Sequence, residues 1–289
     1  MYRIVEKKNL SELVFTMKVE APMIARNRKP GQFVIIQVEP EWGERIPLTI
    51  ADADSDAGTI SLAFQAVGLT TKLLATKKEG EELAAVLGPL GNPSEIENFG
   101  HVVCVGGGFG TAPLFPIVQA LKAAGNKVTV IIGYRTKSLV IMEEEMRNLA
   151  DELIVMTDDG SHGRKGLVTL PLKELCDSPN PPDRVIAIGP PIMMKFCAET
   201  TRPYGIKTIV SLNTIMIDGT GMCGGCRAVV GGETKFVCVD GPEFDAHKVD
   251  FDSMMSRLRA FSPQEKEMLE KHRCNLQEAA DAIAAKEAK

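Results

Sequence analysis

HVVCVGGGFGTAPLFPIVQALKAAG, residues 101–125, decides the fold of the domain that contains it. Its opening HVVCV is a short continuous apolar run, which is typical of a strand buried on both faces. A glycine-rich turn, GGGFGTAP, follows, and the apolar spacing of LFPIVQALKAAG predicts a helix. Strand, turn and helix in this order place backbone N–H groups at the positive end of a helix dipole, where they can bind a phosphate.

The chain after this stretch repeats the alternation of strands and helices. Apolar runs at 128–134, 153–157 and 184–188 are typical of buried strands, and 143–152 has a helical pattern. Strands that alternate with helices indicate βαβ units and a parallel sheet. We therefore expect an α/β dinucleotide-binding domain over residues 99–210.

The chain before this stretch has a different texture. Short apolar runs at 15–19, 33–38, 59–67 and 83–91 are separated by turn signals such as the Pro-Gly pair at 30–31. Several short strands at this spacing predict a small antiparallel β-barrel, which we assign to residues 1–98.

Composition excludes several classes of protein. A chain of 289 residues with 44% hydrophobic and 25% charged residues is an ordinary folded protein of about two domains. Its net charge of -5 disfavours nucleic acid as a partner. The N-terminus lacks the apolar core of a signal peptide, and no run reaches the roughly 18 apolar residues of a membrane span. Most of the 7 cysteines stand singly in apolar contexts, which indicates reduced thiols and a cytoplasmic location.

Three cysteines and many glycines gather in DGTGMCGGCRAVVGGETKFVCVDGP, residues 218–242. A disulfide is disfavoured in a reducing compartment, and a zinc ribbon would show a second C-x₂-C pair. The third reading is an iron–sulfur site, since plant-type [2Fe–2S] proteins use C-x₄-C-x₂-C and a distant fourth cysteine. Here Asp218 stands at the first position, ahead of Cys223, Cys226 and Cys238. An ionised carboxylate can replace a thiolate on iron, although an Asp-Gly pair is also a common turn.

The expected dinucleotide site is formed by loops at the carboxyl edge of the sheet. Asp158 and Asp159 would accept hydrogen bonds from a ribose and repel a 2′-phosphate, which favours NAD(H) over NADP(H). An acidic turn is the alternative, and Arg164 and Lys165 are close enough in sequence to offset the acids. A ligand-free turn is likewise the alternative at the glycine-rich loop. The other candidate residues in these loops are Gly107, Gly108, Gly110, Thr111, Ala112, Gly189, Pro190 and Met193.

The remaining segments are a small cysteine-loop module, 211–250, and a C-terminal tail, 251–289. Ser262, Pro263 and Glu265 have the pattern of a capping box with proline at the first helical position. We therefore expect a long helix from Ser262 to the C-terminus.

With these three sites in order, the chain resembles the ferredoxin–NADP reductase superfamily in its dihydroorotate dehydrogenase electron-transfer-subunit branch. It is most similar there to the small subunits of NADH-dependent reduced ferredoxin:NADP oxidoreductases, also known as sulfide dehydrogenase β subunits. RIPLTI at 45–50 and AFQAVGLTT at 63–71 are similar to the two flavin segments of the superfamily. The resemblance implies that FAD contacts Arg45, Pro47, Leu48, Thr49, Ala63, Phe64, Gln65, Thr70 and Thr71. The dihydroorotate branch has cysteine where this chain has Asp218, so this departure favours the oxidoreductase small subunits.

The resemblance also implies a function. FAD, a [2Fe–2S] cluster and NAD(H) would make the chain an NAD(H)-dependent flavin oxidoreductase subunit, one that converts two-electron into one-electron transfer. The partner would be a larger flavin and iron–sulfur subunit, and the combined reaction would be electron bifurcation. The alternatives are the electron-transfer subunit of dihydroorotate dehydrogenase or another NADH-dependent reductase, and a binding module without FAD. No Ser/His/Asp or Cys/His arrangement is present in the sequence, so we expect no catalytic side chain.

Overall fold

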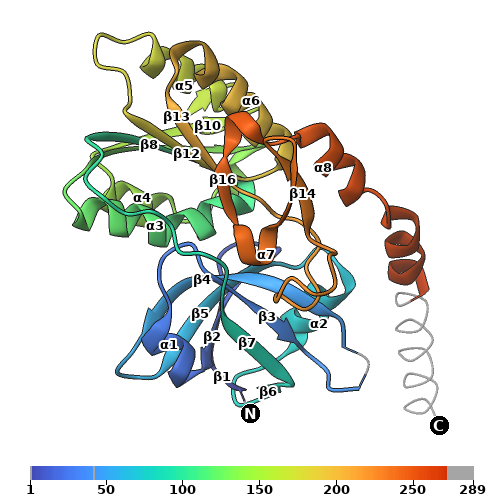
Figure 1. The fold of residues 1–289 in the computed structure, drawn as a ribbon. Helices are drawn as coiled ribbons and strands as arrows, with labels where there is room; N and C mark the ends of the chain where they lie inside the picture. The colour runs from blue at the N-terminus through green and yellow to red at the C-terminus, as the bar shows by residue number, and fades with distance from the viewer. Residues whose placement is uncertain (1, 42, 272–289) are drawn as a thin grey trace.

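The computed structural model describes residues 2–41 and 43–271, and its N-terminal part is a nearly closed antiparallel barrel (Figure 1). Seven strands pair in the order β6-β1-β2-β5-β4-β3-β7. They are β1 (Tyr2–Asn9), β2 (Val14–Glu20), β3 (Phe33–Gln37), β4 (Arg45–Asp54), β5 (Thr59–Gln65), β6 (Glu82–Leu83) and β7 (Ala85–Leu90), with helices α1 (Pro22–Asn27) and α2 (Leu69–Thr76). The predicted barrel is confirmed.

Strand β5 shows how alternation builds the barrel. Ile60, Leu62 and Phe64 are fully buried in the barrel core, because successive side chains of a strand point to opposite faces. Ala63, on the other face, instead joins the hydrophobic cluster formed by helix α3 (Thr111–Ala123). The outer wall of the barrel therefore packs directly against the second domain.

The second domain is a seven-stranded sheet in the order β11-β10-β9-β8-β12-β13-β16. All neighbours are parallel except β16, which pairs antiparallel with β13. The strands are β8 (His101–Gly107), β9 (Lys127–Tyr134), β10 (Glu152–Thr157), β11 (Arg164–Lys165), β12 (Arg184–Ile188), β13 (Lys207–Ser211) and β16 (Glu243–Asp245). This confirms the predicted parallel-sheet domain.

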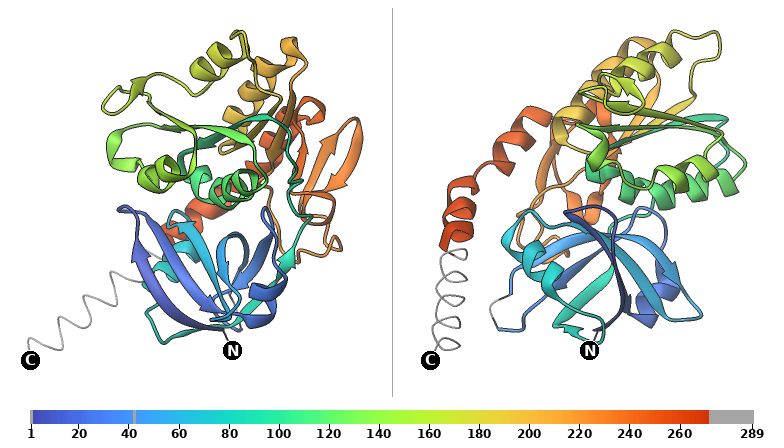
Figure 2. Two further views of the ribbon diagram at one scale, coloured as in Figure 1. Left: turned by 90° about the vertical axis from the view of Figure 1, so that its left-hand side faces the viewer. Right: turned by 180° about the vertical axis from the view of Figure 1, so that it is seen from behind.

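Helices cover both faces of this sheet (Figures 1 and 2). Helices α3 and α4 (Glu143–Leu149) pack on one face, and α5 (Thr169–Cys176) and α6 (Pro191–Thr201) pack on the other. Short 3₁₀ turns lie at η1 (Gly108–Gly110), η2 (Lys137–Leu139), η3 (Arg202–Tyr204) and η4 (Ala246–Lys248). Residues on alternate sides of β8 illustrate the two layers, since Val103 faces the α5 and α6 side and Cys104 the α3 side.

The cysteine region lies beside both larger parts and returns to the sheet (Figure 1). It contains a hairpin of β14 (Arg227–Val230) and β15 (Glu233–Phe236), helix α7 (Val237–Asp240), and then β16. Because β16 pairs with β13, the segment that we expected to be a separate module completes the edge of the parallel sheet.

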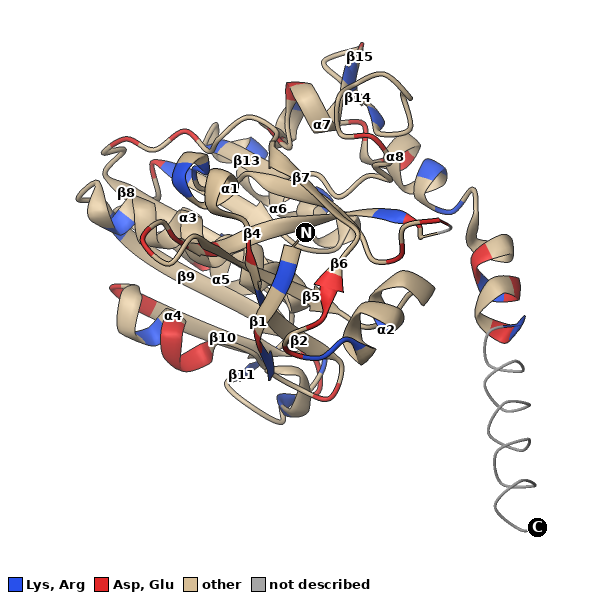
Figure 3. Ribbon diagram, turned by 90° about the horizontal axis from the view of Figure 1, so that it is seen from below, with Lys and Arg blue, Asp and Glu red and all other residues tan. Residues whose placement is uncertain are grey.

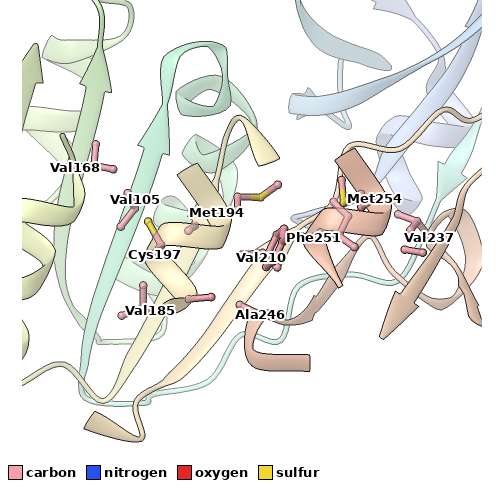
Figure 4. Close-up of a cluster of buried hydrophobic side chains, with 14 of the residues drawn as sticks. Val105, Val168, Val185, Met194, Cys197, Val210, Val237, Ala246, Phe251 and Met254 are labelled. Atoms are coloured by element: carbon pink, nitrogen blue, oxygen red, sulfur yellow. The ribbon is translucent and has the colours of Figure 1, made fainter. Parts of the chain in front are cut away.

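Helix α8 (Phe251–Leu258) fastens this region to the sheet. Phe251 and Met254 are buried in one cluster with Val237 and with Met194 of α6 (Figure 4). Residues 262–271 are helical, and the N–H of Glu265 bonds to the carbonyl of Phe261. The helix thus begins one residue before the predicted start, because Phe261 and not Ser262 supplies the first accepting carbonyl, and the Glu265 N–H bonds to that carbonyl instead of to the Ser262 side chain. The rest of the predicted helix, from 272, lies outside the described residues.

Charged residues of both signs are interspersed over the barrel side (Figure 3). Arg3 pairs with Glu20 and Lys18 with Glu6 on that surface. This mixture is consistent with the net negative charge and differs from the basic stripe of a nucleic-acid-binding protein.

Candidate functional site

A cavity of about 900 Å³ lies between the barrel and the carboxyl edge of the parallel sheet. Both parts of the protein line it, as expected for ligands that bind outside the carboxyl ends of parallel strands. The predicted residues that line this cavity are Pro47, Leu48, Thr49, Gln65, Gly107, Gly108, Gly110, Asp158, Gly189, Pro190 and Met193. The structure thus brings together barrel and dinucleotide-loop residues far apart in sequence.

Several residues predicted for the flavin do not line the cavity. Phe64 is fully buried and stacks on Phe15 with ring centroids 5.5 Å apart, so its side chain packs in the barrel core, and its expected place beside the flavin remains a prediction. Ala63 is buried against the α3 cluster, and Arg45 is exposed at the start of β4. Alternation along β5 explains the orientation of Phe64, because its side chain points to the opposite face from the neighbouring Gln65, which lines the cavity.

The two threonines at the start of α2 have protein partners. The Thr70 hydroxyl donates to Oε2 of Glu44. The Thr71 Oγ1 accepts from the N–H groups of Val67 and Gly68 at 3.1 and 3.0 Å. Thr71 therefore stabilises the turn before α2, Thr70 links α2 to the residue before β4, and neither lines the cavity.

The glycine-rich loop is shaped for close approach of a ligand. Gly108 has a φ of +54°, and a Cβ placed there would meet no atom within 4 Å. Gly110 differs, because a Cβ there would lie 2.2 Å from the carbonyl oxygen of Ile188. Gly110 therefore lets the start of α3 approach the end of β12, while Gly108 keeps one side of the loop open to the cavity.

Thr111 and Ala112 follow the glycine-rich loop, and their side chains point into the protein core. The Tyr134 hydroxyl donates to the carbonyl of Ile141 at 3.0 Å and accepts from the Thr111 hydroxyl at 2.8 Å. Burial raises the pKa of Tyr134 to about 12, so the phenol keeps its proton. Thr111 and Ala112 are both fully buried. Helix α3 turns both side chains into the core, so only the backbone N–H groups of these two residues are left to meet a phosphate, and their expected place in the dinucleotide site remains a prediction.

Asp158 and Asp159, which directly follow β10, have different roles. Asp159 accepts from the Ser161 hydroxyl at 2.6 Å and from the Ser161 N–H at 2.9 Å, and these bonds lower its pKa. Asp158 lines the cavity. Arg164 pairs with Glu174 at 2.6 Å, away from the acids. Within this loop, Asp158 is placed to meet a ligand and Asp159 shapes the turn.

Cys226 and Cys238 are buried with their Sγ atoms 3.2 Å apart, whereas Cys223 is exposed. The N–H of Gly225 points at Sγ of Cys223 at 3.4 Å. Backbone N–H groups directed at sulfur are typical of loops around iron–sulfur clusters. The donor set of three reduced thiols in one loop fits such a cluster.

Asp218 lies in the same loop, and its carboxylate accepts hydrogen bonds from backbone N–H groups of that loop. Its Oδ1 accepts from the N–H of Thr220 at 3.0 Å and its Oδ2 from the N–H of Cys223 at 2.7 Å. These backbone donors lower the pKa of Asp218, so the carboxylate is ionised at neutral pH. Across residues 2–41 and 43–271, no three His, Cys, Asp or Glu side chains converge closely enough to hold a metal ion. The four predicted ligands therefore remain a prediction.

Comparison with known proteins identifies both parts of this site. Residues 213–250 match the model of the iron–sulfur cluster binding domain of dihydroorotate dehydrogenase B, and residues 104–199 match the oxidoreductase NAD-binding domain. The chain is 49% identical over 263 residues to a dihydroorotate dehydrogenase B (NAD(+)) electron transfer subunit homolog of Thermotoga maritima, covering 91% of this chain and 92% of that protein. It is 34% identical over 257 residues to the dihydroorotate dehydrogenase B electron transfer subunit of Bacillus cereus, covering 85% and 96%. The chain belongs to this family of electron-transfer subunits.

The chain is also similar to a solved structure over almost its whole length. The chain matches a chain of the NADH-dependent reduced ferredoxin-NADP oxidoreductase, a structure described for flavin-based electron bifurcation, with a TM-score of 0.88 and 47% identity. The match covers 94% of this chain and 98% of that one. The present family member therefore has an NAD-binding domain, an iron–sulfur binding domain and the FAD-binding barrel of ferredoxin reductases. No helix in the described part of the chain is both long and apolar enough to cross a membrane.

Many cavity residues were not predicted from the sequence of this electron-transfer subunit, and two groups of them follow the central strands β9 and β13. Tyr134 and Arg135 line the cavity at the end of β9, next to the glycine-rich loop. Their position directly after a central parallel strand is a signal that would have found them. Residues 211–214 and Met216 also line the cavity, although we had assigned them to the cysteine module. The same rule applies to them, because they follow the carboxyl end of β13.

Proposed function

We propose that the chain is the subunit that passes electrons between NAD(H) and a larger flavin and iron–sulfur subunit, through FAD and a [2Fe–2S] cluster. The whole enzyme would be an electron-bifurcating NADH-dependent reduced ferredoxin:NADP oxidoreductase. One observation carries this proposal: a single cavity is lined by the barrel, by the dinucleotide loop and by the segment 211–216, which runs directly into the cysteine loop. The barrel and the dinucleotide loops therefore share one cavity, and the segment that leads into the cysteine loop borders it.

The cavity residues would hold the two organic cofactors at opposite ends. Pro47, Leu48, Thr49 and Gln65 would contact FAD from the barrel. The open side of Gly108 would admit a pyrophosphate near the start of α3, and Asp158 would accept from a ribose hydroxyl. Gly189, Pro190 and Met193 would close over the nicotinamide. FAD, when bound, supplies exchange of a hydride with NAD(H) and of single electrons with an iron–sulfur cluster.

Apolar side chains of the cavity would keep water away from the reacting rings. Leu139, Ile192 and Phe196 line the cavity and are 38%, 47% and 47% exposed. Large apolar side chains that stay exposed inside a cavity are suited to cover a flat ring. Bound cofactors would therefore bury part of this surface.

Asp218, Cys223, Cys226 and Cys238 would hold the cluster. The second candidate function, the electron-transfer subunit of dihydroorotate dehydrogenase, has support from the relatives named above. Asp218 favours the first candidate, because the resemblance places cysteine at this position in the dihydroorotate branch. The 47% identity to the oxidoreductase chain over 94% of this chain favours it as well.

Isolation of the native complex tests the proposal. We expect a yellow protein absorbing near 450 nm, with iron and acid-labile sulfide but no zinc, together with a larger flavin and iron–sulfur subunit. Co-purification of a dihydroorotate dehydrogenase catalytic subunit would support the second candidate. A colourless protein with one zinc per chain would contradict both. We also propose a cytoplasmic location, because the cysteines of the described residues are free thiols.

A further inference from the structure

One buried hydroxyl in the cavity wall has no partner in the protein. Among the described residues, Oγ1 of Thr214 is the one buried side-chain nitrogen or oxygen atom without a hydrogen bond. The residue is 8% exposed and lines the cavity. A buried hydroxyl left without a hydrogen bond destabilises the folded state, so such atoms in native proteins usually have a partner.

The neighbours of Thr214 place it at the barrel end of the cavity. The segment that contains it runs from β13 to the cysteine loop, and Gly219 in that loop sits against the barrel, since a Cβ there would lie 2.6 Å from Cδ1 of Leu90. Phe33 and Thr49 are directly paired across β3 and β4, and both line the same cavity as Thr214. Phe33 also shares one buried cluster with Leu212 and Met216, which lie on either side of Thr214 in the chain, so the segment that contains Thr214 packs beside the barrel wall of the cavity.

We propose that Thr214 donates a hydrogen bond to the isoalloxazine ring of FAD, an inference that rests on the proposed function of the cavity. A threonine hydroxyl has one donor and two acceptor positions, and the ring offers nitrogen and oxygen acceptors along its polar edge. Reduction makes the ring richer in electrons, and hydrogen bonds to charged acceptors are stronger than bonds to neutral ones. Thr214 therefore stabilises reduced FAD more than oxidised FAD.

Thr214→Val tests this in the full chain, because valine keeps the shape and removes the hydroxyl. We expect the dissociation constant of oxidised FAD, measured by flavin fluorescence, to rise about fivefold to tenfold. The dissociation constant of reduced FAD should rise by a factor at least three times larger than the factor for oxidised FAD. This difference is measured as a lower flavin midpoint potential in a dye-equilibrated redox titration.

Two further variants separate contact from packing. Thr214→Ser keeps the hydroxyl and should restore both values. Thr208→Val is the matched control, because its hydroxyl is also fully buried but bonds to Thr201 at 2.6 Å and to the carbonyl of Ile206 at 3.0 Å. It should lower stability and leave the flavin potential unchanged.

Unchanged affinity and potential in Thr214→Val would overturn the inference, and so would a change confined to the KM for NADH, which would indicate contact with nicotinamide instead. Failure of Thr214→Ser to restore the potential would also contradict it. A wild-type chain that takes up no FAD would contradict the proposed function itself, and this inference with it.

Discussion

The Sγ atoms of Cys226 and Cys238 lie 3.2 Å apart in the interior, although the two residues come from the two ends of a hairpin. The hairpin brings them together, since β14 begins directly after Cys226 and α7, which contains Cys238, begins directly after β15. Cys223 and Asp218 lie on the exposed side of the same loop. The buried pair is preformed by the hairpin, and the other two predicted ligands belong to the glycine-rich segment.

Asp218 provides the sharpest test of the cluster. If it is a ligand, Asp218→Ala leaves one iron with three protein contacts, and we expect a labile cluster with reduced iron content. Asp218→Cys should retain the cluster as an all-thiolate site, with a changed potential. EPR spectra and redox titrations of the three proteins check this, and identical results in all three would show that the carboxylate is only a turn residue. Cys176→Ala, remote from the loop on α5, should leave the iron content unchanged.

Gly108 tests the phosphate-binding role of the glycine-rich loop. Gly108→Ala would direct a methyl group into open space beside the cavity and strain a φ of +54°, at a cost of about 1–2 kcal/mol. Gly205→Ala is the matched control, because it has a φ of +65° and also meets no atom within 4 Å. We expect similar losses of Tm in both variants. Only Gly108→Ala should raise the KM for NADH, by about tenfold or more, and equal KM values would argue against phosphate binding here.

Asp158 tests the choice of nucleotide. We expect the kcat/KM of flavin reduction to be higher with NADH than with NADPH, because Asp158 lines the cavity where a 2′-phosphate would bring like charge. Asp158→Ala should narrow this preference about fivefold to tenfold. Arg164→Ala should leave it unchanged, since Arg164 pairs with Glu174. Stopped-flow reduction measures both, and an unchanged preference in Asp158→Ala would contradict a role of Asp158 in the choice of nucleotide.

The raised pKa of the Glu243 carboxyl predicts how the free energy of unfolding depends on pH. Its Oε1 accepts from the Ser94 hydroxyl, and burial raises the pKa of this carboxyl above its usual value. A raised carboxyl pKa gives stability that is present below the unfolded-state pKa and is lost as the pH rises through the folded-state pKa. Glu243→Gln should keep the bond to Ser94 without this loss. We expect its Tm to exceed that of wild type by about 2 °C near neutral pH, with the difference disappearing in acid.

Glu95 is the matched control with the opposite sign. Hydrogen bonding to Arg184 lowers the pKa of Glu95, so its contribution is present above the unfolded-state pKa and is lost as the pH falls through the folded-state pKa. Glu95→Gln should therefore lower the Tm near neutral pH and have no effect in acid. Thermal unfolding of the three proteins between about pH 4 and 8 checks both signs. Parallel curves for wild type and Glu243→Gln would contradict the buried-carboxyl argument.

Local pattern was enough to predict the architecture. The short runs around β3 and β5 predicted the barrel, and the strand–glycine–helix order at 101–125 predicted the parallel-sheet domain. These features depend on the period of the apolar residues and on turn chemistry, which neighbouring residues in the chain determine. The cysteine spacing pointed to iron and sulfur for the same reason, because all four predicted ligands lie in one short segment of the chain, residues 218–238.

The assignment of individual side chains to the cavity depended on tertiary packing. Phe64, Thr111 and Asp159 stand beside residues that line the cavity, yet the first two face the core and the third shapes its own turn. One position along a strand or helix changes the face of the side chain, so a motif names a segment but not the atom that meets the ligand. Arg135 and Thr214 reach the cavity because separate strands end at one edge of the sheet, against a barrel formed by another part of the chain. Such long-range neighbours leave no periodic trace in the sequence.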